Sequence, residues 1–223
     1  MAPPRLPPAA LLNRDINAIP SAFASKVRAV ARHELGHYVV ARVLGVRTDG
    51  ISVELSGNLA QWGHHGQTVI NLTRDLITLE DVVSYLETRV IVLYAGACAE
   101  ALPEFATPGM VVDNQKAVSI VQTPHLGAAQ DHAKVREHVH LLRNIRNTLP
   151  ADDADCQSQL DAIEIPLWNK AVGLVSRYAD TIVGVSLTLS TRIVRFNEKV
   201  FMDEAMLSAI PKIRDLPSAG GPP

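Results

Sequence analysis

The segment Arg32-His-Glu-Leu-Gly-His37 constrains the fold of this chain most strongly, because its side chains can act together only on a helix. Residues four apart lie on one face of a helix, so His33 and His37 can both present a ring nitrogen to one metal ion. Glu34 is one residue round from His33 and can reach a water on that metal without binding the metal. This HExxH pattern predicts a zinc site in which the imidazoles are ligands and the carboxylate is a general base.

The residues around the motif favour a helix from Ser21 to Leu44. Ser21 is a suitable N-cap, and Gly45 is a suitable stop. Gly36 is a poor helix former, and it is expected where a backbone or a substrate approaches closely. Two imidazoles without a ligand would be costly on such an apolar helix, which favours a metal site over a chance match. The apolar positions with helical spacing are Phe23, Val27, Val30, Val40 and Leu44.

The rest of the chain predicts an α+β fold that is mainly α-helical. Residues Ile51–Leu55 alternate between apolar and polar, and Gln67–Asn71 is a second candidate strand after the turn at 56–58, so we expect a small β-sheet or hairpin. Thr78 and Asp81 resemble a capping box at the start of an apolar helix. The helices expected after the sheet cover residues 81–102, 113–122, 128–149, 166–190 with Pro166 in the first turn, and a short segment from Asp203.

Composition excludes several classes of function. The chain has 223 residues, is 47% hydrophobic and 4% aromatic, and has a net charge of −2, so it can bury a core but lacks the charge and aromatic content of a nucleic-acid-binding protein. Cys98 and Cys156 do not make a disulfide framework, which favours a reducing compartment. The N-terminus lacks a signal-peptide pattern, and the apolar run Val90–Ala99 is short of the roughly 20 residues of a membrane span. We therefore expect a cytoplasmic protein with no membrane span and no nucleic-acid partner.

Residues 27–45, VRAVARHELGHYVVARVLG, resemble the HEAGH helix of the M41 peptidase family, the protease domain of FtsH-type enzymes. Leu35 replaces the usual alanine of that family. Residues 91–100, IVLYAGACAE, are similar to the family's apolar helix that ends in GGRAAE, with Cys98 in place of the arginine. The resemblance implies a zinc metalloendopeptidase that acts on polypeptide substrates, with Zn²⁺ as the cofactor and Glu34 as the catalytic residue.

The resemblance implies an aspartate as the third zinc ligand beside His33 and His37, in a pattern like TTGASND that opens a helix. Two places compete for this role. Residues 127–131 keep the Gly-Ala pair and place Asp131 in the first turn of a long helix, whereas residues 107–113 keep a threonine and the spacing of Asp113 from Glu100. We favour Asp131, because the helix that follows it is longer and better anchored.

Other candidate ligands are weaker. The extended motif HExxHxxGxxH needs a histidine where this chain has Val43. A glutamate ligand on the next helix would be Glu100 or Glu87, and Glu100 is equally a candidate for orienting a ligand histidine or for a surface position. The remaining histidines considered are interpreted as surface or packing residues: His64, His65, His132, His138 and His140.

The chain has no GxxxxGK[ST] phosphate loop, so the resemblance implies a stand-alone peptidase without the AAA ATPase module. A separate ATPase partner or a homo-oligomer stays open, and the alternative function is a catalytically inactive peptidase-like interaction or regulatory module. Substrate is expected in extended form along the edge of the sheet near Ile51–Leu55. The expected parts are a disordered proline-rich arm at 1–20, a zinc peptidase core at 21–150, a C-terminal helical subdomain at 151–215 and a disordered tail at 216–223.

Overall fold

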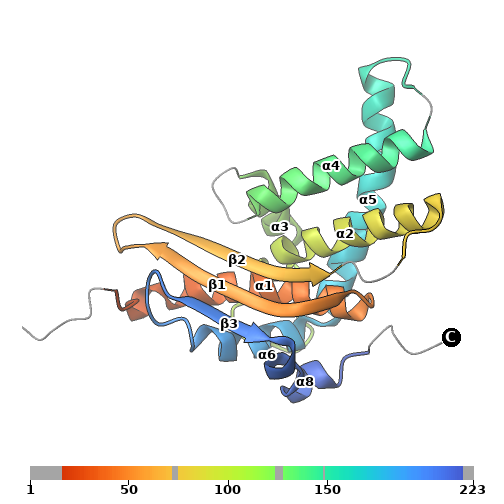
Figure 1. The fold of residues 1–223 in the computed structure, drawn as a ribbon. Coiled ribbons are helices and arrows are strands. Elements are labelled where there is room, and N and C mark those ends of the chain that lie inside the picture. Colours follow the sequence, from red (N-terminus) through yellow and green to blue (C-terminus); the bar gives the residue numbers. More distant parts are fainter. Residues whose placement is uncertain (1–16, 72–74, 124–127, 148, 218–223) are drawn as a thin grey trace, which may run out of the picture.

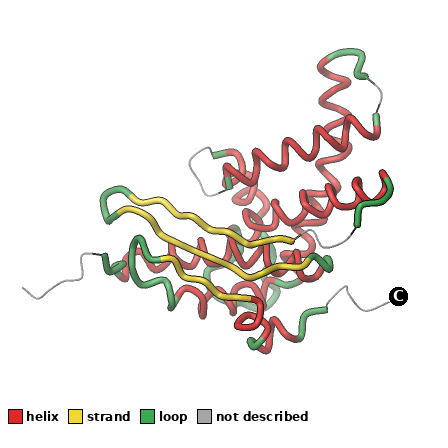
Figure 2. The backbone as a smooth tube through the Cα atoms, in the orientation of Figure 1, coloured by secondary structure: helices red, strands yellow, loops and turns green. Residues whose placement is uncertain are grey.

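The computed structural model describes residues 17–71, 75–123, 128–147 and 149–217. It confirms a mainly helical α+β fold with one small antiparallel sheet (Figure 1). The three strands run side by side on one side of the molecule, and helices make up the rest (Figure 2). In chain order the elements are η1 (Ser21–Phe23), α1 (Ala24–Val43), β1 (Arg47–Gly57), β2 (Trp62–Asn71), α2 (Leu79–Glu100), α3 (Asn114–Gln122), α4 (Ala129–Arg146), α5 (Asp153–Arg177), α6 (Ala179–Ser190), β3 (Lys199–Asp203), α7 (Glu204–Ser208) and α8 (Pro211–Arg214).

Helix α1, which carries the HExxH motif, is the central element. Every residue from 30 to 41 is buried, because α1 packs against α2, α6 and the strands β1 and β2. Gly45 adopts a φ of 73°, as expected of a glycine that ends a helix. The predicted N-cap at Ser21 is wrong. Ser21 lies inside the 3₁₀ turn η1, and α1 begins at Ala24 without a side-chain cap, while the ring of Phe23 anchors this end of the helix by packing edge-on against aromatic rings.

The sheet has the strand order β2-β1-β3, with both pairs antiparallel. The predicted strand at Ile51–Leu55 forms the middle of β1, which pairs with β2 on one side and with β3 on the other. The expectation of a substrate edge at Ile51–Leu55 is therefore wrong, since the main-chain groups there are already used in the sheet. In the described part of the chain, β2 pairs on one side only, so β2 is the edge strand beside α1.

Helix α2 begins with the predicted capping box between Thr78 and Asp81. Its last turns contain small side chains, which let α1 approach closely: a Cβ atom added to Gly36 would lie 2.4 Å from the carbonyl oxygen of Ala95. By length and composition this helix could cross a membrane, and it is longer than the apolar run seen in the sequence. However, 61% of its most apolar window is buried inside the fold, as in the core helix of a globular protein. Its length and composition are therefore weak evidence for a membrane span.

The C-terminal part differs from the prediction at Pro166, which lies inside α5 rather than in the first turn of a helix. Helix α5 begins earlier, at Asp153, because Asp152 is its N-cap and accepts a hydrogen bond from the main-chain N–H of Asp155. The expected single helix at 166–190 is two helices, α5 and α6. Asp203 caps α7 by accepting from the N–H of Met206, as expected of a helix that starts there.

The predicted subdomain at 151–215 supplies parts of the common core, since β3 pairs with β1 and α6 packs on α1. The predicted arm and tail lie mainly outside the described residues, but their inner ends belong to the fold. Ala18 forms a β-bridge with Arg195, and Leu216 is buried. Disorder is therefore the wrong prediction for residues 17–20 and for Leu216, because these residues are held by backbone pairing and apolar burial.

Candidate metal centre

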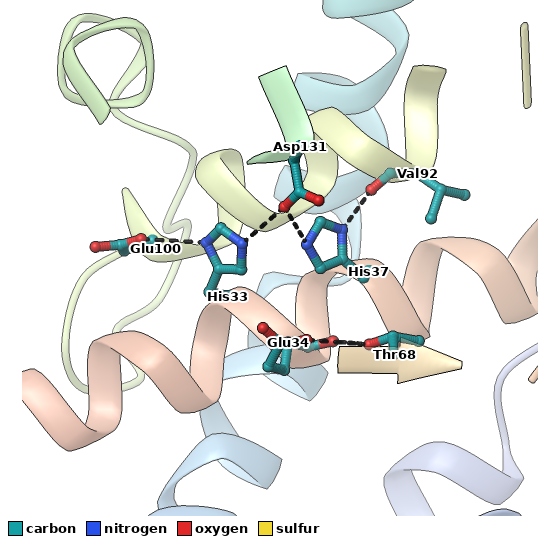
Figure 3. A network of polar contacts seen from close by, with 7 residues as sticks. All are labelled: His33, Glu34, His37, Thr68, Val92, Glu100 and Asp131. Carbon is teal, nitrogen blue, oxygen red and sulfur yellow. Dashed lines mark hydrogen bonds and ion pairs between the residues drawn. The ribbon is translucent and has the colours of Figure 1, made fainter. Parts of the chain in front are cut away.

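The motif side chains of α1 meet the start of α4 in a buried site (Figure 3). His33, Glu34 and His37 are only 2%, 4% and 6% exposed. Asp131 lies in the first turn of α4, and its Oδ2 is 3.2 Å from His33 Nε2 and 3.0 Å from His37 Nε2. Two elements about 100 residues apart thus bring two imidazole nitrogens and one carboxylate oxygen to one point.

The second nitrogen of each imidazole has its own partner. His33 Nδ1 lies 3.2 Å from Oε2 of Glu100, and His37 Nδ1 lies 2.7 Å from the main-chain oxygen of Val92. Both partners come from α2. A proton on each Nδ1 would be donated to these oxygens, which leaves both Nε2 lone pairs facing Asp131. Metal-binding histidines commonly have this arrangement, in which a second partner orients the ring.

Two of the three separations between the converging atoms fit a small tetrahedral cation. One ligand atom from each of His33, His37 and Asp131 lies within 4.8 Å of the other two. Nitrogen and oxygen ligands at the Zn–N and Zn–O distances of about 2.0–2.1 Å are about 3.3 Å apart on a tetrahedron. This is close to the 3.2 Å and 3.0 Å that separate Asp131 Oδ2 from Nε2 of His33 and of His37. Gly96 also leaves space at this point, because a Cβ atom there would lie 2.4 Å from His37 Nε2 and 2.7 Å from His33 Nε2.

Charge is concentrated at the site. Burial lowers the pKa of His33, but the hydrogen bonds to Asp131 and Glu100 outweigh it and raise that pKa to about 10. Burial raises the pKa of Asp131, but the two histidines more than compensate and hold it well below its usual range. The carboxylates of Asp131 and Glu100 therefore stabilise positive charge on the imidazole side of the site.

Glu34 lies against the edge strand β2. A Cβ atom on Gly66 would lie 1.8 Å from Glu34 Oε1, so the carboxylate occupies the space that a side chain at Gly66 would need. The hydroxyl of Thr68 donates to the main-chain oxygen of Glu34 at 3.0 Å and lies 3.5 Å from its Oε2. Burial raises the pKa of the Glu34 carboxyl. The Glu34 carboxylate is thus close to the histidines, but it packs against β2, whereas the two imidazoles are oriented by residues of α2.

The structure separates the competing candidates for the third ligand. Asp131 lies beside the histidines, whereas Asp113 is the N-cap of α3 and accepts a hydrogen bond from the main-chain N–H of Lys116. Gly127 of the pattern that favoured Asp131 lies outside the described residues. Glu87 pairs with Arg146 across the α2–α4 seam and does not contact the histidines.

His64, which the sequence suggests is a surface or packing residue, lies inside β2 and is half-buried. It lines the same cavity as the candidate metal ligands, as does the more exposed His65. Its pKa is lowered by burial. His64 shares one face of β2 with Gly66 and Thr68, which contact Glu34 of α1, because alternate residues of a strand lie on the same face. The packing roles of Gly66 and Gly96 were also missed, since nothing local in the sequence shows what a glycine faces.

The cavity over the site has a volume of about 590 Å³ and is bounded by α1, β2, α2 and α4. This size is within the range of small-ligand pockets. Compared with models of protein families and with curated proteins, the chain shows no match, so its resemblance to the M41 family stays a prediction.

Proposed function

We propose that this protein is a zinc metalloendopeptidase of the M41 type that acts without an ATPase module of its own. The observation that carries the proposal is the convergence of His33 Nε2, His37 Nε2 and Asp131 Oδ2, each imidazole being oriented by a second partner. Two neutral imidazoles and one carboxylate form a donor set that suits zinc in catalytic sites, which keep further positions open. The ion would supply Lewis acidity toward a water molecule and toward the scissile carbonyl group.

The protein's own residues supply the proton transfers. The Glu34 carboxylate is next to the imidazole pair but does not belong to the converging set, so it is free to act as a base. It accepts a proton as the water oxygen bonds to the carbonyl carbon. It then gives that proton to the amide nitrogen as the C–N bond breaks, which releases an amine and a carboxylic acid, and the acid loses the second proton of the water to solvent.

Strand β2 is the proposed support for the substrate, in place of the edge expected from the sequence. Gly66 of this strand lies against the Glu34 carboxylate, and in the described part of the chain β2 pairs on one side only, so an extended peptide can pair with its other edge. Polypeptide segments without stable structure are therefore the proposed substrates. Cytoplasmic localisation, and delivery of substrate by a separate ATPase, stay predictions.

The test compares wild-type protein with Glu34→Gln, both loaded with zinc, on an unfolded casein substrate. We expect both proteins to hold near-stoichiometric zinc, and we expect only the wild type to cleave, with its activity lost on chelation. Retained cleavage by Glu34→Gln would contradict the role of Glu34. Stoichiometric zinc with no cleavage by either protein would favour the alternative of an inactive interaction or regulatory module.

A further inference from the structure

The cavity over the metal site has a basic corner that the proposed chemistry does not use. The acidic residues that line the cavity, Glu34, Glu100 and Asp131, all lie at the histidines. Away from them the charged lining residues are cations, among them Arg89 of α2 and Lys134 of α4. The chain as a whole is slightly acidic, so this corner contrasts with its overall charge.

The placement of these cations follows from helix geometry. Asp131, Lys134 and His138 are spaced i, i+3 and i+7 on α4, which puts them along one stripe of the helix. Arg89 lies three residues before Val92, whose carbonyl oxygen orients His37. Arg89 and Lys134 line the same cavity. Burial lowers the pKa of His138, the positive charges of Arg89 and Lys134 lower it further, and the carboxylate of Glu137 opposes them.

Two nitrogen atoms of this cluster have unused hydrogen-bonding capacity. Arg89 Nη1 and His138 Nδ1 are buried and have no hydrogen-bond partner among the described residues. A buried donor of this kind is costly, and an arginine in a cavity wall is the residue best suited to bind a carboxylate through two parallel hydrogen bonds. The third basic residue of the lining, Lys26, is on α1 and stacks over the rings of Phe23 and Trp62, so it is not part of the cluster.

We propose that Arg89 and Lys134, with His138 beside them, form an anion subsite that binds a carboxylate of the peptide substrate. This inference rests on the proposed peptidase function. A helix rises about 1.5 Å per residue, so the stripe from Lys134 to His138 lies roughly 5–10 Å along α4 from Asp131. An extended peptide advances about 3.3 Å per residue, which places the bound carboxylate about one to three residues from the scissile bond. The carboxylate comes from an acidic side chain or from the C-terminus of the substrate.

The test measures binding rather than cleavage, in the zinc-loaded Glu34→Gln protein. The fluorescent peptides have one length and form three sets. The first set has no carboxylate, and the second has an amidated C-terminus and one glutamate at successive positions. The third has a free C-terminus as its only carboxylate. We expect a carboxylate to strengthen binding about tenfold at low ionic strength. Tight binding of the glutamate peptides identifies a side-chain subsite, and tight binding of the free-ended peptide alone identifies a C-terminal subsite.

The same measurement on the Glu34→Gln protein that also carries Arg89→Gln and Lys134→Gln should show equal, weak affinity for all peptides. Arg146→Gln is the matched control, because it removes an arginine charge from the same α2–α4 seam, where Arg146 pairs with Glu87 away from the cavity lining. It should keep the preference for carboxylates. Thermal unfolding checks that every variant is folded.

The subsite would be overturned if the Glu34→Gln protein bound all peptides with equal affinity or bound none of them. A preference for carboxylate peptides that survives the double substitution would overturn it as well. Cleavage is measured separately on the wild type. A wild type that cleaves neutral peptides without any carboxylate preference keeps the peptidase function and loses the subsite. A preference that depends on Arg89 and Lys134, without any cleavage, keeps the subsite and contradicts the peptidase.

Discussion

At the residue scale, Gly96 shows how the site depends on a missing side chain. A Cβ atom at this position would lie within 2.7 Å of Nε2 of both His33 and His37, where a metal ion would also contact them. We expect Gly96→Ala to lose most of its zinc, measured as metal per chain after dialysis. The ligands themselves are unchanged, so the loss would come from space alone.

Gly173→Ala is the control for that experiment. Gly173 also lies in a helix, α5, but a Cβ atom there would meet nothing within 4 Å. This variant should keep its zinc and gain about 0.5–1 kcal/mol of stability from the better helix former. Full zinc content in Gly96→Ala would show that the metal does not occupy the space between the two imidazoles.

Glu100 is a residue whose predicted role stayed open until its contact with His33 Nδ1 was known. We expect Glu100→Ala to weaken zinc affinity about 10- to 100-fold, because the imidazole loses the carboxylate that orients it and increases its basicity. Competition with a chromophoric chelator measures this affinity. Glu104→Ala removes a nearby carboxylate that instead binds Ser25 and Arg28, and its zinc affinity should equal that of the wild type. Equal affinities of the two variants would contradict the role of Glu100.

At the element scale, the edge strand β2 contacts Glu34, the proposed base, rather than the candidate metal ligands. In Gly66→Ala, the new methyl group would collide with the Glu34 carboxylate, which must then move. We expect this variant to keep its zinc but to lose most peptide hydrolysis, measured as kcat at saturating substrate alongside zinc content.

The same strand offers a matched control in Gly63. A Cβ atom there comes no closer than 3.4 Å, to Ser56 Oγ, so Gly63→Ala should retain both zinc and activity. Loss of zinc from Gly66→Ala would show that β2 supports the ligands as well. Unchanged activity would show that the observed position of Glu34 is not the catalytic one.

The elements also show what could be predicted from the sequence. The helix around His33 and His37 and the capping box at Thr78 depend on local spacing, so local reasoning found them. Strand β3 was missed, because its five residues become a strand only by pairing with β1, which is about 150 residues away. The helix break at Pro166 was misjudged for a similar reason, since the capping of α5 by Asp152 outweighed the usual preference of proline for a helix start.

The residues of the candidate site also divide into those that local spacing predicts and those that only distant contacts bring together. Spacing within one helix identified His33, Glu34 and His37, but the choice of Asp131 over Asp113 depended on how two distant helices meet. The carbonyl oxygen of Val92 carries no signal in the sequence at all, because every residue has such a group.

At the scale of the whole molecule, the proposed metal joins α1 directly to α4, two helices that are otherwise connected through α2 and α5. His33 and His37 lie on α1, Asp131 lies on α4, and both helices pack on α2. A ligand that binds only the folded state stabilises it by mass action, which amounts to about 2.7 kcal/mol at a free concentration 100 times the Kd. Zinc should therefore raise the free energy of urea-induced unfolding of the metal-free protein by about this amount at that concentration.

Two aspartate variants decide whether this stabilisation comes from the proposed site. Asp131→Ala should lose the zinc-dependent increase, since one of three ligands is gone. Asp113→Ala should be less stable by about 1 kcal/mol with or without zinc, because it loses the cap of α3, but its increase on adding zinc should match that of the wild type. Comparing the zinc-dependent increase in unfolding free energy between the two variants distinguishes a metal ligand from a structural residue, even where both variants are less stable than the wild type. An increase that persists in Asp131→Ala and disappears in Asp113→Ala would move the third ligand to Asp113 and require α3 to rearrange toward α1.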